Sequence, residues 1–169
     1  SSDQVLINEF FNGTGKTRLC LEAGRALRQR FPHGVYFVDL APITDPALVA
    51  STIAHTMGIR EGGGRPAFDN LRDYLADKRA LLLLDNLEQV ISAAPVVAGL
   101  LAPTRHVAVL ATSRIPLQLR GEREYPVDTL RVPPRAGLPV EALGDYEAVR
   151  FFVRQAQAAR PAFELTADN

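Results

Sequence analysis

A short apolar run near the N-terminus is followed by a glycine-bearing turn and a lysine–threonine pair. Residues 5–7 (Val-Leu-Ile) precede Asn12-Gly13-Thr14-Gly15-Lys16-Thr17-Arg18, after which a long amphipathic segment begins. Glycines let backbone N–H groups converge on phosphate oxygens, and the helix that follows directs its positive N-terminal end at them. Lys16 would reach the β- and γ-phosphates of a nucleotide, and the Thr17 hydroxyl would hold a magnesium ion. The spacing therefore predicts a phosphate-binding loop.

Position 10 departs from the full pattern of such a loop. The pattern places a glycine five residues before Gly15, and this chain has Phe10 there. A side chain at that point restricts φ and fills space where the backbone must approach the phosphates closely. The second half of the loop is therefore intact, whereas the first half is altered.

A carboxylate ends a later apolar run. Residues 81–84 are all leucine and are followed directly by Asp85. A magnesium–triphosphate site needs a carboxylate on the strand next to the phosphate loop, which holds the metal directly or through water. We therefore expect Asp85 to be the second metal ligand. The alternative is that Asp85 only caps the helix that follows.

Other polar residues follow the same or the next apolar run, and each of them allows two interpretations. Arg114 either contacts a terminal phosphate or is a surface arginine at a strand end. Thr112 and Ser113 either sense the γ-phosphate by hydrogen bonding or satisfy nearby backbone groups. Glu88 either polarises a water molecule or stabilises the first turn of its helix.

The composition limits the classes of function. The 169 residues carry no net charge, which argues against a dedicated nucleic-acid surface. The single cysteine, Cys20, rules out a disulfide within the chain, and we expect it to be a small buried thiol. No apolar run approaches the roughly 20 residues of a membrane span. We expect a cytoplasmic protein.

Apolar runs alternate with amphipathic segments along most of the chain. This alternation predicts an α/β fold in which a parallel five-stranded sheet carries helices on both faces. The expected strands are 5–9, 35–38, 80–86, 107–111 and 123–127. Ligands of such sheets bind beyond the carboxyl ends of the strands, where the candidate site residues lie.

Proline and glycine divide the chain near its C-terminal end. Residues 132–139 contain three prolines and one glycine, a composition that does not sustain regular structure. We expect a nucleotide-binding domain over residues 1–130, a proline-rich linker over 131–144, and the start of a truncated helical subdomain over 145–169.

Several motifs occur together in one order. They are Gly-Thr-Gly-Lys-Thr-Arg-Leu, Leu-Leu-Leu-Leu-Asp-Asn-Leu-Glu, Ala-Thr-Ser-Arg and Glu-Arg-Glu-Tyr-Pro-Val. As a set they resemble the nucleotide-binding domain of STAND-class P-loop ATPases, the NB-ARC-like and AAA-like kind found in large bacterial regulators. LuxR-type and antibiotic-regulatory transcriptional activators are among those regulators. The resemblance spans roughly residues 12–165.

This resemblance implies a switch that closes around ADP, opens and assembles with ATP, and is reset by slow hydrolysis. It implies a P-loop NTPase fold, ATP or ADP with Mg²⁺ as ligands, magnesium at Thr17 and Asp85, and γ-phosphate sensing at Arg114. The full candidate sets combine the resemblance with the residue patterns. The candidate nucleotide contacts are Asn12, Gly13, Thr14, Gly15, Lys16, Thr17, Arg18, Thr112, Ser113 and Arg114. The candidate catalytic residues are Lys16, Asp85, Glu88 and Arg114.

Asn86 stands where many hydrolytic relatives place a catalytic glutamate, and asparagine cannot act as a general base. We therefore expect ATP hydrolysis to be slow or absent. The expected partners are neighbouring helical, winged-helix and DNA-binding domains, with ATP-dependent self-association and without direct contact to nucleic acid or membrane. Two alternatives remain open: an active ATPase, and a degenerate scaffold or protein-interaction domain, which Phe10 favours.

Overall fold

The computed structural model describes residues 5–8, 15–60, 64–126, 130–134 and 138–166. Phe10, Asn12, Gly13 and Thr14, which the sequence places in the phosphate loop, lie outside these residues. The chain divides into two compact units, Ser1–Val127 and Asp128–Asn169. Each unit is described by itself.

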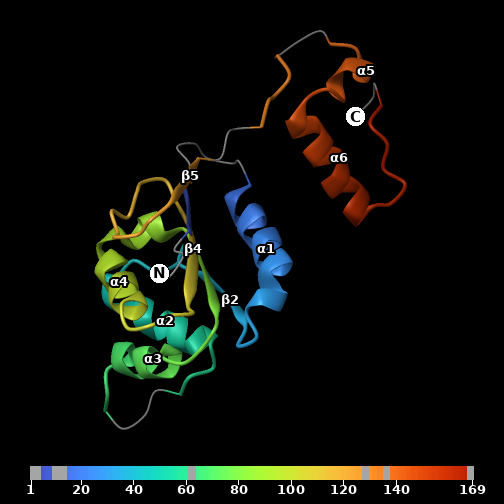
Figure 1. Cartoon of the computed structure of the whole chain (residues 1–169). Helices are drawn as coiled ribbons and strands as arrows, with labels where there is room; N and C mark the ends of the chain where they lie inside the picture. The colour runs from blue at the N-terminus through green and yellow to red at the C-terminus, as the bar shows by residue number, and fades with distance from the viewer. Residues whose placement is uncertain (1–4, 9–14, 61–63, 127–129, 135–137, 167–169) are drawn as a thin grey trace. The chain divides into compact units, whose positions relative to one another are not determined.

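The first unit is a parallel sheet with helices packed against it (Figure 1). Its strands lie in the order β2-β3-β4-β1-β5. The strands are β1 (Val5–Asn8), β2 (Val35–Asp39), β3 (Leu81–Asp85), β4 (Ala108–Ser113) and β5 (Glu124–Pro126). The helices are α1 (Lys16–Leu27), η1 (Arg28–Arg30), η2 (Pro46–Leu48), α2 (Val49–Thr56), α3 (Ala67–Leu75), η3 (Leu87–Ala93) and α4 (Ala94–Leu101).

Helices cover both faces of this sheet. Cys20 of α1 packs with Leu81, Leu83 and Leu110 on one face, and α2, α3 and α4 cover the other (Figure 1). Successive side chains of a strand point to opposite faces, so the leucines of β3 serve both cores. A strand covered on both sides is expected to be apolar throughout, and every residue of β3 is buried. The predicted α/β fold with a parallel sheet is confirmed.

The strand order corrects one expectation. Asp85 was expected on the strand next to the phosphate loop, but β3 pairs with β2 and β4. Strand β4 lies between β3 and β1, which leads into the loop. The order of parallel strands depends on how each crossover packs, and periodicity within one strand carries no information about it.

The sequence from Glu88 to Leu101 predicts a single helix, but the structure has two helical segments there. Val90 has non-helical backbone angles (φ −131°, ψ 45°) inside η3, and α4 begins at Ala94 with Pro95 in its first turn. Proline lacks an N–H donor and is favoured at the start of a helix. Asp45-Pro46, an N-cap acceptor followed by proline, predicts a helix start. The structure confirms it, because the Asp45 carboxylate accepts the Ala47 N–H at 2.9 Å.

The second unit contains helices α5 (Val140–Leu143) and α6 (Glu147–Ala159). Helix α5 falls inside the range expected as a linker, and neither helix has a fully buried residue. The rings of Phe152 and Phe163 meet edge to face at 5.8 Å between centroids. No helix within the described residues is long and apolar enough to span a membrane.

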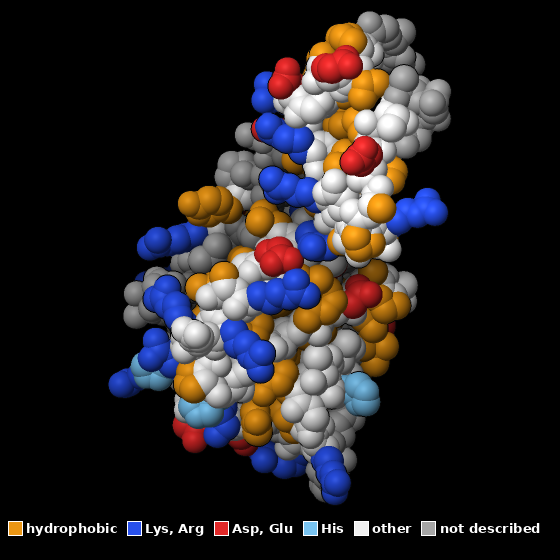
Figure 2. Space-filling view, turned by 90° about the vertical axis from the view of Figure 1, so that its right-hand side faces the viewer, with side chains coloured by type: hydrophobic (Ala, Val, Ile, Leu, Met, Phe, Trp, Pro, Cys, Tyr) orange, Lys and Arg blue, Asp and Glu red, His pale blue; other side chains and the backbone are white. Residues whose placement is uncertain are grey.

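Charged side chains are mixed on the face shown in Figure 2, where lysine and arginine lie dispersed among acidic and hydrophobic groups. On α1, the exposed Glu22 carboxylate pairs with Arg18 at 3.3 Å and with Arg25 at 2.9 Å. Surface pairs of this kind stabilise a protein little.

Candidate nucleotide site

The N-terminus of α1 presents the two residues expected to contact phosphate and metal. Gly15 caps the helix in a left-handed conformation with φ 85°, and a Cβ placed there would meet nothing within 4 Å. The conformation, rather than lack of space, therefore favours glycine at this position. Lys16 and Thr17 follow in the first turn, which contains no acidic residue. No acidic side chain within the turn itself therefore offsets the partial positive charge of this helix end.

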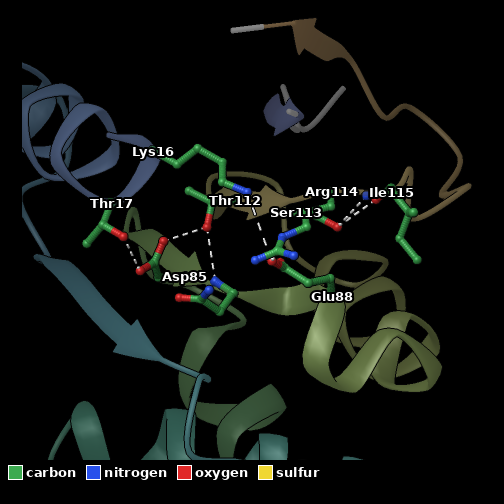
Figure 3. Close-up of polar contacts among 9 residues, drawn as sticks. Lys16, Thr17, Asp85, Glu88, Thr112, Ser113, Arg114 and Ile115 are labelled. Carbon is green, nitrogen blue, oxygen red and sulfur yellow. Dashed lines mark hydrogen bonds and ion pairs between the residues drawn. The ribbon is translucent and has the colours of Figure 1, made fainter. Parts of the chain in front are cut away.

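Thr17 and Asp85 meet although 68 residues separate them in the chain. The Thr17 hydroxyl donates a hydrogen bond to Asp85 Oδ2 at 2.6 Å (Figure 3). Asp85 is only 3% exposed. The two residues expected to be metal ligands, taken from separate motifs, are therefore neighbours.

Thr112 holds the other oxygen of the same carboxylate. Its hydroxyl donates to Asp85 Oδ1 at 2.5 Å and accepts the Asn86 backbone N–H at 3.0 Å. Asn86 has a left-handed conformation with φ 60°, which is uncommon for a residue other than glycine. Thr112, which is buried, thus ties the end of β4 to the turn that follows β3.

The Ser113 hydroxyl bonds locally. It donates to the Ile115 carbonyl oxygen at 2.6 Å and accepts the Ile115 N–H at 3.2 Å. In this structure, therefore, Thr112 and Ser113 both satisfy groups of the protein itself, which is one of the two interpretations their sequence allowed.

Glu88 lies between two cations. Its Oε1 is 3.2 Å from Arg114 Nε and 4.0 Å from Lys16 Nζ (Figure 3). The Glu88 side chain is 10% exposed, and neither carboxylate oxygen has a hydrogen-bond partner among the described residues. The contact between Glu88 and Arg114 is thus an ion pair without the geometry of a hydrogen bond. Arg114 is 45% exposed and Lys16 is 12% exposed.

Cys20 lies under this site on α1. Burial raises the pKa of its thiol from 9.0 to about 12, and the nearby Asp85 charge contributes in the same direction. The predicted buried thiol is confirmed.

The donor chemistry fits magnesium. A hydroxyl and a carboxylate supply the oxygen ligands that Mg²⁺ prefers, and the ion normally keeps several waters and substrate phosphates as its remaining ligands. The described residues hold no group of three or more His, Cys, Asp or Glu side chains that would bind a metal alone. Thr17 and Asp85 would therefore act together with a bound nucleotide.

Sequence reasoning missed two contacts here: the bonds of Thr112 to Asp85 and Asn86, and the pairing of Glu88 with Arg114. Both join the end of β3 to the end of β4. Each partner stood at the end of an apolar run, so the signal was present. Only the adjacency of the two strands, which the sequence did not reveal, brings them together.

Comparison with solved structures finds a protein with a similar α/β fold. The ORC2 protein of Aeropyrum pernix, determined as complexes with ADPNP and ADP, matches 73% of this chain and 42% of its own with a TM-score of 0.53. Sequence identity is 17%, so this likeness concerns the fold alone. No family model matches the chain.

Two kinds of mycobacterial protein are similar in sequence. "Putative HTH-type transcriptional regulator Rv0890c" of Mycobacterium tuberculosis is 35% identical over 158 residues. "Putative HTH-type transcriptional regulator Mb0914c" of Mycobacterium bovis has the same identity over the same number of residues. An uncharacterised M. tuberculosis protein, Rv0894, is 32% identical over 159 residues. The chain spans 16% of the length of the regulators and 37% of the length of Rv0894.

Proposed function

We propose that this chain is the nucleotide-binding switch domain of a multidomain bacterial regulator of the STAND class. It binds ADP or ATP with Mg²⁺ and passes the nucleotide state to neighbouring domains, which include a DNA-binding effector. The name of the mycobacterial regulators supports this setting, and so does the small share of their length that the chain spans. In this proposal residues 1–130 form the binding domain, and α5 and α6 of the second unit belong to a helical subdomain.

The observation that carries this proposal is the hydrogen bond between Thr17 and Asp85. A hydroxyl in the first turn after a Gly-Lys-Thr loop and a buried carboxylate at a strand end are the two protein ligands of a magnesium–nucleotide site. A scaffold without a ligand would have no need to bury this carboxylate beside the open end of a helix.

The residues have distinct roles in the proposed site. Lys16 and the N-terminus of α1 neutralise the β- and γ-phosphates, and Arg114 contacts the terminal phosphate. Bound Mg²⁺ would neutralise phosphate charge. Thr17 and Asp85 hold that ion, and Thr112 keeps Asp85 oriented. Asn86 offers no general base, so hydrolysis is slow and the domain acts as a switch.

Thermal unfolding with and without nucleotide tests the proposal. A ligand at about a hundred times its Kd adds roughly 2.7 kcal/mol to stability, which raises Tm by about 5–10 °C for a chain of this size. We expect this shift with both Mg–ADP and Mg–ATP, and we expect Lys16→Ala to abolish it.

The matched control is Lys78→Ala, because Lys78 is the only other lysine and pairs with Asp77 at 2.9 Å. This variant should keep the full shift. No shift with either nucleotide in the unaltered chain would reject nucleotide binding and favour a scaffold. Rapid ATP turnover that Asp85→Asn abolishes would instead favour an active ATPase.

A further inference from the structure

The Glu88 carboxylate provides negative charge beside the two cations of the candidate site, Lys16 and Arg114. It is nine-tenths buried and lies against both side chains that the proposed function assigns to phosphate, at 3.2 Å from Arg114 Nε and 4.0 Å from Lys16 Nζ. A buried carboxylate is stable only beside a positive partner, because desolvation disfavours its charge. Without nucleotide, the two cations compensate the charge of Glu88, and the three side chains together keep one net positive charge.

The backbone around Glu88 fixes where the carboxylate lies. It belongs to the first turn of η3, directly after the left-handed Asn86, whose N–H bonds to buried Thr112. The turn is therefore anchored to β4, the strand that Arg114 directly follows. The guanidinium is the mobile member of the pair, since Arg114 is 45% exposed and its side chain is long.

The two cations serve different phosphates. Lys16 reaches the β-phosphate as well as the γ-phosphate, so it engages a diphosphate and a triphosphate alike. Arg114, in the proposed site, contacts only the terminal phosphate of a triphosphate. A diphosphate therefore leaves the Glu88–Arg114 pair in place, whereas a triphosphate must separate the pair and bring further negative charge towards Glu88.

We propose that Glu88 sets the preference of this site for a nucleoside diphosphate over a triphosphate, by holding Arg114 until a γ-phosphate displaces it. This inference rests on the proposed function. It gives Glu88 a role in selectivity instead of in activating water, and it predicts that removing the carboxylate improves triphosphate binding.

The test is calorimetric titration of the chain with Mg–ADP and with Mg–ADPNP, which is not hydrolysed, before and after Glu88→Gln. Glutamine keeps the size of the side chain and removes its charge. We expect the Kd for ADPNP to fall about tenfold, equivalent to about 1.4 kcal/mol, and the Kd for ADP to change less than about twofold. In an Arg114→Gln background, Glu88→Gln should leave both constants nearly unchanged.

The control variant is Glu22→Gln, which removes the same charge from an exposed position on α1. It should alter neither constant. Equal tightening of ADP and ADPNP by Glu88→Gln would overturn the inference, because it would show a general charge effect. Weaker ADPNP binding would also overturn it and would make Glu88 a ligand of nucleotide or metal. Absence of binding to the unaltered chain would reject the proposed function itself, and the inference with it.

Discussion

Replacing Thr112 with valine removes the hydroxyl that links β4 to Asp85 and Asn86 while keeping the shape of the side chain. Two hydrogen bonds are lost, at 2.5 Å to the Asp85 carboxylate and at 3.0 Å from the Asn86 N–H. A hydrogen bond to a charged group contributes about 1.5–3 kcal/mol, and an unpaired backbone donor costs about 1 kcal/mol more. We therefore expect Thr112→Val to lower the free energy of unfolding by about 2–4 kcal/mol.

Urea unfolding followed by far-UV circular dichroism measures this change, since the chain has no tryptophan. In thermal unfolding the same loss corresponds to about 5–15 °C in Tm. Thr112→Ser is the matched control, because serine keeps the hydroxyl and loses one methyl group, which costs about 1 kcal/mol. The reasoning is refuted if valine proves as stable as serine at this position, because Asp85 would then not depend on Thr112.

Two further predictions concern Asp85 and Cys20. If Asp85 holds Mg²⁺, Asp85→Asn should weaken ADP binding in the presence of Mg²⁺ by roughly tenfold or more. ADP binding measured in EDTA should stay unchanged. An equal loss of ADP affinity in both conditions would contradict a metal role for Asp85. The raised pKa of Cys20 means that the folded state keeps a proton that the unfolded state releases near its ordinary value of 9.0. The protonated thiol therefore contributes fully to the free energy of unfolding below pH 9.0, and this contribution is lost as the pH rises towards about 12. The free energy of unfolding, compared with that of Cys20→Ala, should therefore decline by up to about 1.4 kcal/mol per pH unit above 9. Urea unfolding at pH 8 and 10 measures this difference, and identical pH slopes for the two proteins would exclude it.

The sequence predicted those features that depend on local pattern. The four leucines before Asp85 identified a strand covered on both faces, and Asp45-Pro46 identified a helix start. The break at Val90 was missed because the apolar spacing continues across it, although Pro95 signalled where the second helix begins.

Residue types and spacing were enough to choose the candidate site residues, but not to predict the contacts between them. Gly15, Lys16, Thr17 and Asp85 were chosen because their types and spacing suit phosphate and magnesium. The bonds of Thr112 depend on β4 lying beside β3, which the order of the strands decides. That order follows from the packing of whole helices on the sheet, and no single motif encodes it.

The pairing of β3 with β4 also determines which changes in chain length the site tolerates. Leu84 and Ala111 are the last pair of residues between β3 and β4. Asp85 and Thr112 each follow this pair by one residue. Strand side chains alternate with a period of two, so one residue inserted within β3 would turn Asp85, and one inserted within β4 would turn Thr112, to the opposite face of the sheet. An insertion in the connection after α4 would leave this alignment intact. The connection between α4 and β4 can therefore vary in length without disturbing the site, whereas the two strands cannot.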